Sequence, residues 1–326
     1  MAKRSLQTLS KDERTAALHE LAEASLADFD LTGGSLMLLQ DLVNSSFRVQ
    51  HDSRQWYLRI YNPDRHNTSA IESELLFLEA LTKGGFPAPR PLRKPSDEML
   101  WVASQSPVVD AIRISVCSWL PGEILQYDKT PRHYANLGTV LARLHEFSAK
   151  WDPPAGFVRP RCDSEGIYGN HGASGSQVMR GWDNIDRPLR SDLEDAKRAL
   201  EQAENAIGTD CGRYGLIHGD PSFGNVLFDG EMPYLIDFDD FGYGHYVFDL
   251  AVVLAGAWGK PDFEENCSAL FEGYGQIREL SQAEMNALPA TMAARAASLI
   301  FWAAAQASQH PWIEGQWQRL KEYMES

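Results

Sequence analysis

The segment from Leu216 to Asp249 constrains the fold of this 326-residue chain more than any other part of its sequence. Short apolar runs flank a polar loop that carries Asp220 and Asn225, and after a turn a further apolar run ends at Asp237. Apolar runs of this length, bounded by turn residues, predict short strands. The side chains of Asp220, Asn225 and Asp237 are therefore expected on two neighbouring loops, where the strands stop and a ligand can bind.

Three oxygen-bearing side chains in this order predict phosphoryl transfer. Carboxylate and amide oxygens suit Mg²⁺, which keeps several waters and bridges to substrate phosphates. A further carboxylate beside the metal can accept the proton of a hydroxyl while that hydroxyl attacks phosphorus. In kinases the catalytic Asp and a metal-binding Asn share one loop, and a metal-binding Asp follows. Asp220 and Asn225 have this spacing, and Asp237 follows them.

The same run resembles the signature of a known family, the aminoglycoside phosphotransferase and choline kinase superfamily. That signature reads H-G-D-x-x-x-x-N followed by I-D-F/W-x, and the chain has it at residues 218–225 and 236–239. The phrase F-D-L-A at residues 248–251 is also typical of the family. Together with Y-L-R-I-Y at residues 57–61, it makes the chain similar to the homoserine kinase-like and stress-response kinase-like branches.

The resemblance implies an α+β, bilobal protein kinase-like fold. We expect a small, β-rich nucleotide-binding lobe over residues 1–120. A larger, mainly helical lobe for catalysis and substrate binding is expected over residues 121–326. The breaker Pro121-Gly122 marks the boundary between them.

The resemblance also implies roles for individual residues of the second lobe. Asp220 is the expected catalytic base, and Asn225 and Asp237 are expected to hold Mg²⁺. Asp249 is expected to support the catalytic loop through hydrogen bonds without touching the substrate. For Asp239 three roles stay open, which are a second metal contact, binding of a cationic substrate, and simple solvation.

The first lobe contains a candidate ion pair for the nucleotide phosphates. Kinase-like folds place a cation over these phosphates and tether it with a helix carboxylate. Arg59 lies in the middle of a predicted strand, on the face opposite Leu58 and Ile60, and Glu74 lies on the predicted helix that follows. Arg59 and Glu74 are therefore the candidate pair, although an ordinary surface pair has the same sequence pattern.

Two further segments of the first lobe are candidates for binding ATP. The run Asn44-Ser45-Ser46, expected between two strands, would cover the phosphates with hydroxyl and backbone N–H groups, although no G-x-G-x-x-G motif is present. The run at residues 119–122 resembles the family's interlobe linker, so the backbone at Ser118 and Leu120 is expected to hydrogen-bond adenine. ATP and Mg²⁺ are the cofactors that this interpretation requires.

Hydrophobic periodicity predicts the remaining elements. A helix is expected over Lys11–Leu26 and another before Gly84, and mainly helical patterns follow residue 121. The segment at residues 151–183 is rich in glycine and proline and is expected to form a long loop or lid. Strands are expected near residues 47–49 and 56–60, and over 99–103 and 112–120.

Charge and cysteine content narrow the class of protein. The 30 basic and 45 acidic residues give a net charge of −15, which argues against nucleic acid or an anionic membrane as a partner. It permits a cationic substrate or a metal. The four cysteines form no C-x-x-C pair, and no apolar run suffices for a membrane span, so we expect a cytoplasmic protein. The sequence leaves the oligomeric state open.

The leading hypothesis is transfer of the γ-phosphate of ATP to a hydroxyl of a small molecule, including amino-bearing or cationic ones. One alternative is a Ser/Thr protein kinase of the same fold, although no A-P-E-like end of an activation loop follows Asp237. Another is a nucleotide-binding regulatory pseudoenzyme, which the intact motif disfavours. Four tryptophans could form an aromatic box for a cation, but helix packing is the favoured explanation for each of them; these are Trp182, Trp302, Trp312 and Trp317.

Overall fold

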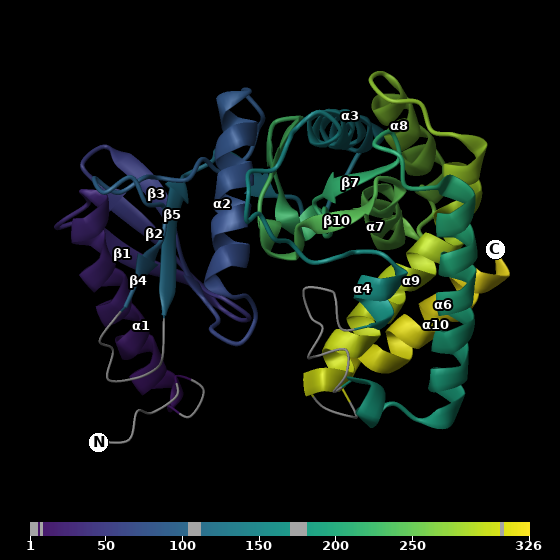
Figure 1. The fold of residues 1–326 in the computed structure, drawn as a ribbon, viewed down its shortest axis with the longest axis horizontal. Helices are drawn as coiled ribbons and strands as arrows, with labels where there is room; N and C mark the ends of the chain where they lie inside the picture. The colour runs from purple at the N-terminus through teal and green to yellow at the C-terminus, as the bar shows by residue number, and fades with distance from the viewer. Residues whose placement is uncertain (1–5, 7–8, 104–111, 170–180, 307–309) are drawn as a thin grey trace. The chain divides into compact units, whose positions relative to one another are not determined.

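The computed structural model describes residues 6, 9–103, 112–169, 181–306 and 310–326 (Figure 1). The chain folds into two compact units. Unit 1 comprises Met1–Leu120 and Gly156–Val158, and unit 2 comprises Pro121–Ala155 and Arg159–Ser326. That the first unit binds nucleotide and the second performs catalysis stays a prediction.

Unit 1 is built on a five-stranded antiparallel sheet of order β1-β2-β3-β5-β4. Its two long helices lie on opposite faces of the sheet. Side chains of the first helix share a core with Phe47 and Leu58, whereas Leu75 of the second helix packs with Tyr61 and Cys117. Successive strand residues point to opposite faces of the sheet. The side chains of β3 therefore contribute to the core on one face and contact α2 on the other. The elements are α1 (Lys11–Leu26), η2 (Ala27–Phe29), β1 (Ser35–Asp41), β2 (Ser45–His51), β3 (Arg54–Tyr61), α2 (Thr68–Lys83), β4 (Trp101–Val102) and β5 (Arg113–Ser118).

Local signals explain the ends of both helices in unit 1. The Ser10 side chain accepts a hydrogen bond from the N–H of Glu13, and the Glu13 carboxylate accepts one from the Ser10 N–H, which forms a capping box at the start of α1. Asn67 caps α2, and Gly84 follows its last turn. The predicted bounds of α1 agree with the structure, and the strands predicted at residues 99–103 and 112–120 are shorter in it.

Unit 2 is mainly helical, with two small antiparallel sheets. Helix α3 packs on α8, and α9 packs on α6, α7 and α10. The close contact of α3 with α8 needs glycine, since a Cβ on Gly273 would lie 1.8 Å from the Ala135 carbonyl oxygen. The helices are α3 (Pro131–Ser148), α4 (Ser164–Tyr168), α6 (Arg187–Ile207), α7 (Val247–Ala257), α8 (Phe263–Gly275), α9 (Gln282–Gln306) and α10 (Trp312–Glu325).

The two small sheets of unit 2 carry the loops of the sequence motif. One sheet pairs β7 (Tyr214–Ile217) with β10 (Gly242–His245), and the other has the order β6-β8-β9. Its strands are β6 (Glu123–Ile124), β8 (Val226–Asp229) and β9 (Met232–Leu235). Short 3₁₀ turns, η3 (Phe223–Asn225) and η4 (Phe238–Asp240), lie before β8 and after β9.

The segment at residues 151–183 is not a single long loop. It contains α4, because the side chain of Asp163 accepts a hydrogen bond from the N–H of Gly166 and so starts a helical turn. Residues 170–180 of this segment lie outside the described residues.

Helix α9 is long and apolar enough to cross a membrane by length and composition. However, 67% of its apolar stretch is buried within the protein, against α6, α7 and α10. This is the burial expected of a core helix rather than of a lipid-facing one.

Candidate active site

The loop between β7 and β8 has a shape that only glycine permits at one position. Gly219 has a φ of +81°, and a Cβ there would lie 2.5 Å from the carbonyl oxygen of Asp240. Two bonds from Asn225 then close the loop. Its side-chain Nδ2 donates to the Asp220 carbonyl at 3.0 Å, and its backbone N–H donates to the Ser222 carbonyl at 2.8 Å. The position of Asp220 is therefore fixed by the backbone of its own loop.

Asp249 anchors this loop from the first turn of α7. Its carboxylate is completely buried and accepts hydrogen bonds from the N–H groups of His218 and Gly219, both at 2.9 Å. It also accepts one from His145 Nε2 at 3.0 Å. Burial lowers the pKa of His145, so this ring is neutral, and its Nδ1 accepts from the Tyr274 hydroxyl at 2.9 Å. Every oxygen of the Asp249 carboxylate is therefore used by the protein and none by a ligand.

Asp220 itself lies beside an arginine that the sequence analysis missed. Nη2 of Arg295, in the middle of α9, donates to Asp220 Oδ1 at 2.7 Å. The side chains of Asp220 and Arg295 are 20% and 14% exposed. The other oxygen, Oδ2, has no hydrogen-bond partner within the part of the chain that the structure describes. Asp220 can thus accept a proton at Oδ2 while Arg295 holds Oδ1.

Asn225 and Asp237 leave the same end of the β8–β9 hairpin. Val226 lies opposite Leu235 in this hairpin, and the N–H of Ile236 donates to the Asn225 carbonyl at 3.0 Å. Asp237 has φ 60° and ψ 67°, in the left-handed region that side-chain-bearing residues seldom adopt. Aspartate adopts this region more readily than most residues, and four others in the described chain do so, so the conformation orients Asp237 without by itself marking a functional position.

His218 connects the loop between β7 and β8 to the loop between β9 and β10, residues 236–241, which is called the second loop below. Its Nε2 is 3.0 Å from the Ile236 carbonyl oxygen, and its Nδ1 accepts from the N–H of Asp220 at 3.3 Å. These partners require a proton on Nε2 and a lone pair on Nδ1, so the ring is a neutral tether between the loops. It is completely buried and is not placed to take a proton from a substrate.

Arg159 supports the second loop and was also missed by the sequence analysis. Its guanidinium donates to three backbone carbonyls, those of Phe241 at 2.7 Å, Asp239 at 3.0 Å and Phe238 at 3.3 Å. It also lies over the Phe241 ring at 5.0 Å. Asp239 is 7% exposed, so simple solvation, one of its expected roles, is wrong. The remaining two roles are still predictions.

The candidate metal ligands of the two loops are few, and all of them are oxygen donors. Within the described ranges no three His, Cys, Asp or Glu side chains are close enough to bind a metal together. Asn225 and Asp237 contribute one amide and one carboxylate group. This donor set fits Mg²⁺, which takes one or two protein carboxylates and completes its shell with waters and phosphate oxygens. It does not fit a structural zinc site.

In unit 1, Arg59 and Glu74 form a buried ion pair. Arg59 Nη1 is 3.4 Å from Glu74 Oε1, and the two side chains are 8% and 3% exposed. The guanidinium also lies 5.7 Å from the ring centroids of Tyr57 and Tyr61. The pair is buried, so it is not the ordinary surface pair that the sequence also allowed; its role at the nucleotide phosphates stays a prediction.

The expected placement of Ser45 and Ser46 between two strands is wrong. Both residues begin β2 and are 3% and 1% exposed, because pairing within the sheet buries this edge. The Ser45 hydroxyl donates to Asp41 Oδ1 at 2.7 Å. The turn between β1 and β2 is residues 42–44, so of the predicted run only Asn44 lies between two strands; Leu42 in this turn is 76% exposed.

Hydrogen bonds within the protein already use the polar groups of Ser118. The Ser118 N–H donates to the Arg90 carbonyl at 2.8 Å, and its hydroxyl accepts from the Arg90 N–H at 2.9 Å. Among the described residues nothing bonds to the backbone of Leu120. Of the two expected adenine-binding positions, only Leu120 therefore has a free N–H within the described chain.

The four tryptophans do not form one aromatic box. Trp302 lies 5.4 Å from Trp312 and 5.6 Å from His310, measured between ring centroids. Trp182 instead packs on Phe301, and the indole N–H of Trp317 donates to Asp192 at 2.6 Å. Trp182 and Trp317 therefore have separate partners within the protein, in agreement with the packing role that the sequence favoured over a cation box.

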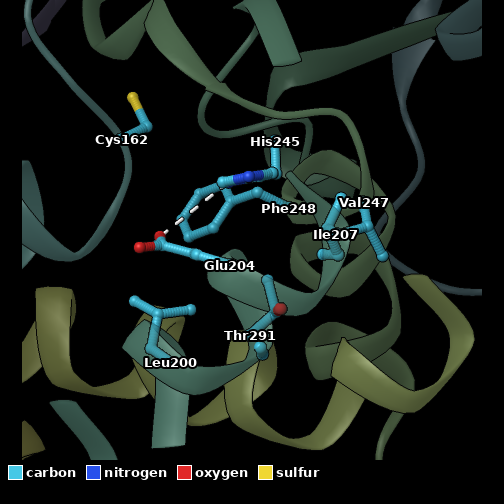
Figure 2. Close-up of a pocket in the computed structure, with 9 residues that line it drawn as sticks. Cys162, Leu200, Glu204, Ile207, His245, Val247, Phe248 and Thr291 are labelled. Atoms are coloured by element: carbon cyan, nitrogen blue, oxygen red, sulfur yellow. Dashed lines mark ion pairs between the residues drawn. The ribbon is translucent and has the colours of Figure 1, made fainter. Parts of the chain in front are cut away.

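A small cavity of about 10 Å³ lies behind the second loop, between α6, α7 and α9 (Figure 2). That volume is close to one water molecule. Glu204 and His245 face it, with Glu204 Oε1 3.9 Å from His245 Nδ1. Burial raises the pKa of Glu204 to about 7 and lowers the pKa of His245, so the carboxyl and the ring both favour their neutral forms. The cavity is too small for a substrate.

Comparison with known proteins gives one family match and several similar chains. The model of the phosphotransferase enzyme family matches residues 38–288. A homoserine kinase of Parvibaculum lavamentivorans is 29% identical over 282 residues, which cover 83% of this chain and 80% of the relative.

Among solved structures, a microcompartment-associated aminopropanol kinase has a TM-score of 0.78 and 25% identity, with 94% of this chain and 95% of that chain covered. The amicoumacin kinase hAmiN has a TM-score of 0.78 at 18% identity, with 96% of both chains covered. These structures confirm the predicted α+β, bilobal kinase-like fold.

Proposed function

The chain belongs to the phosphotransferase enzyme family, and on that premise we propose that it is an ATP- and Mg²⁺-dependent kinase that phosphorylates a hydroxyl of a small molecule. The family membership confirms the resemblance seen in the sequence. The nucleotide, the metal and the roles of individual residues are parts of the proposal.

The observation that carries the proposal is the state of Asp220. Its loop is held by Asp249, and Arg295 occupies one carboxylate oxygen while the other has no partner in the described chain. In the proposed reaction the acceptor hydroxyl donates a hydrogen bond to Oδ2. Its proton passes to Asp220 as the new O–P bond forms and the bond between the γ-phosphorus and the bridging oxygen of ADP breaks. Positioning supplies most of the catalysis in such transfers.

Asn225 and Asp237 would hold Mg²⁺, which neutralises phosphate charge when bound. Arg59, tethered by Glu74, would bind the phosphates within unit 1, and the Leu120 N–H would bind adenine. An adenine nucleotide is supported by the amicoumacin kinase structure, which is a complex with AMP-PNP and Ca²⁺.

The relatives support a small acceptor over a protein one. Two of the relatives are named after their compounds, homoserine and aminopropanol, which are small and carry a hydroxyl and an amino group. This favours a small-molecule kinase over a Ser/Thr protein kinase. A regulatory pseudoenzyme is disfavoured because Asp220, Asn225 and Asp237 are all present. The cytoplasm, where ATP is abundant, is the expected location.

An ATP-consumption screen tests the proposal. The purified chain is assayed with ATP and Mg²⁺ against amino alcohols, hydroxy amino acids, sugars, aminoglycosides and a peptide library. We expect turnover with a small hydroxyl compound only. Asp220→Asn should lower kcat by roughly 10²–10⁴-fold and leave the Kd for ATP within about twofold. Asp229→Asn, which removes an exposed carboxylate at the end of β8, is the matched control and should change neither. Full turnover by Asp220→Asn would refute the mechanism.

A further inference from the structure

Arg295 has more hydrogen-bonding capacity than its one partner uses. A guanidinium carries five N–H donors in a planar fork. Within the described ranges only Nη2 donates a side-chain bond, to Asp220 Oδ1 at 2.7 Å, although the side chain is only 14% exposed. None of its nitrogens is among the buried atoms without a partner, so the unused donors are open to solvent beside Asp220. A positively charged fork that faces solvent next to the proposed catalytic base is placed to bind an anion.

The position of Arg295 on α9 places this site on a partly exposed strip. Ser298, Leu299 and Trp302 follow it at helical spacing and are also partly exposed, whereas the other residues of 291–304 are buried. Trp302 lies roughly 10 Å further along the axis at about 1.5 Å per residue. The strip is thus charged at the end beside Asp220 and apolar beyond it, which suits a short acceptor with an anionic group near its hydroxyl.

We propose that Arg295 binds a carboxylate of the acceptor, so that the acceptor is a short hydroxy acid such as an amino acid with a hydroxyl side chain. This inference rests on the proposed function. One edge of the guanidinium holds Asp220, and its remaining donors hold the acceptor carboxylate. A bidentate pair of this kind orients as well as binds.

The charge at this position argues against a purely cationic acceptor. Arg295 already offsets the charge of Asp220, so an amino alcohol without an acid group gains little from that carboxylate and meets a fixed positive charge beside it. A hydroxy amino acid has a carboxylate to pair with that charge. The two acceptor chemistries therefore differ in the group that Arg295 recognises.

Matched substrate pairs test the proposal. Each pair is a hydroxy amino acid and the amino alcohol that loss of its carboxyl group leaves. The pairs are serine with 2-aminoethanol, homoserine with 3-amino-1-propanol, and threonine with 1-amino-2-propanol. The wild-type kcat/KM should favour the acid of the productive pair by about 10²-fold or more, because a buried charge-assisted pair is lost with the carboxylate.

Two variants locate the effect. Arg295→Gln should lower kcat/KM for both members of a pair, because it also frees Asp220 Oδ1, but it should lower that for the acid by roughly 10²-fold more, mainly through KM. Arg295→Lys keeps the charge without the fork and should lie between. Arg143→Gln, which removes an exposed arginine on α3, should change neither. Circular dichroism confirms that the variants fold.

Three results would overturn the inference: a wild-type preference for the amino alcohol, an equal loss on both members of a pair in Arg295→Gln, or turnover only with hydroxyl compounds that lack an acid group. An equal loss would show that Arg295 positions Asp220 or contacts the phosphoryl group. In each of these cases the proposed kinase function stands. Absence of ATP turnover with every acceptor would instead remove that function and this inference together.

Discussion

Replacement of Glu204 by Gln should stabilise the protein relative to wild type, and this difference in the free energy of unfolding should grow as pH rises. Glu204 lies on α6 behind the second loop, beside the small cavity in Figure 2. Oε1 accepts from the N–H of Ser164 at 2.9 Å, and Oε2 accepts from the Ser164 hydroxyl at 2.6 Å. A Gln amide can keep both contacts, since the hydroxyl can turn to accept from Nε2. The substitution therefore removes a charge and little else.

The magnitude follows from the pKa of Glu204. Burial raises this pKa from 4.5 to about 7, in spite of the Ser164 bonds, with Asp163 raising it further and Arg161 opposing. Between these pH values the folded protein holds a proton that the unfolded chain releases, so the free energy of unfolding falls as pH rises. At about 1.4 kcal/mol per pH unit, the loss reaches about 3 kcal/mol by pH 8. The amide of Glu204→Gln does not titrate, so the variant escapes this loss.

Urea denaturation at pH 5, 6, 7 and 8 measures the effect, with fluorescence and circular dichroism recorded together to check for a single transition. The variant should gain on wild type as pH rises, by about 2.5 kcal/mol between pH 5 and pH 8, with most of the gain below pH 7. The matched control is Glu201→Gln, a half-exposed carboxylate one turn away, which should follow the wild type within about 0.5 kcal/mol. Parallel curves for Glu204→Gln and wild type would refute a buried carboxyl that titrates near neutrality.

Two further substitutions test the support of the catalytic loop. Asp249→Asn should lower the free energy of unfolding by about 3–5 kcal/mol and reduce kcat. The reason is that one amide cannot accept from His218, Gly219 and His145 together. Urea denaturation and turnover measure the two effects, and unchanged stability would contradict the prediction. Gly219→Ala should reduce kcat by about 10²-fold or more, since its Cβ would lie 2.5 Å from the Asp240 carbonyl and displace Asp220. Gly230→Ala is the control, because it also has a positive φ but nothing within 4 Å, and should cost only about 1 kcal/mol of stability with kcat intact.

The parts of the site that sequence predicts are those with local signals. The loop of Asp220 and Asn225 is read from apolar runs around a polar turn, and β7 and β8 lie where those runs are. The Arg59–Glu74 pair is read from strand alternation and the helix that follows, and the structure contains it. In each case the partners are close in sequence, or a repeating pattern fixes which face they occupy.

Residue type misleads where tertiary burial decides the outcome. Ser45 and Ser46 have the composition of a turn, yet β2 begins with them because pairing with β1 and β3 continues through both. The short helix α4 lies within a segment without periodicity, and one capping side chain, Asp163, is enough to start it. The strand position of the two serines has no local signal, and that of α4 is limited to a single capping residue.

Arg159 and Arg295 were missed for a different reason. Arg159 lies in a glycine- and proline-rich segment, and Arg295 in an alanine-rich helix 75 residues after its partner Asp220. Both reach the loops with long side chains across the fold, so no spacing in the sequence relates them to the motif. A signal was nonetheless present in α9, since a lone arginine in an otherwise apolar stretch of helix requires a partner.

The two arginines also change how the charge of the chain should be interpreted. A net charge of −15 with acidic residues in the motif suggests a cleft that attracts cations. Around Asp220, however, the local arrangement differs from that average. Asp249 is saturated by N–H groups, Asp220 is paired with Arg295, and Arg159 covers the carbonyls of the second loop. Because interactions in a largely buried site are dominated by charges within a few ångströms, the bound acceptor interacts more strongly with Arg295 than with the acidic surface. The local charge therefore favours an acceptor that brings its own anion.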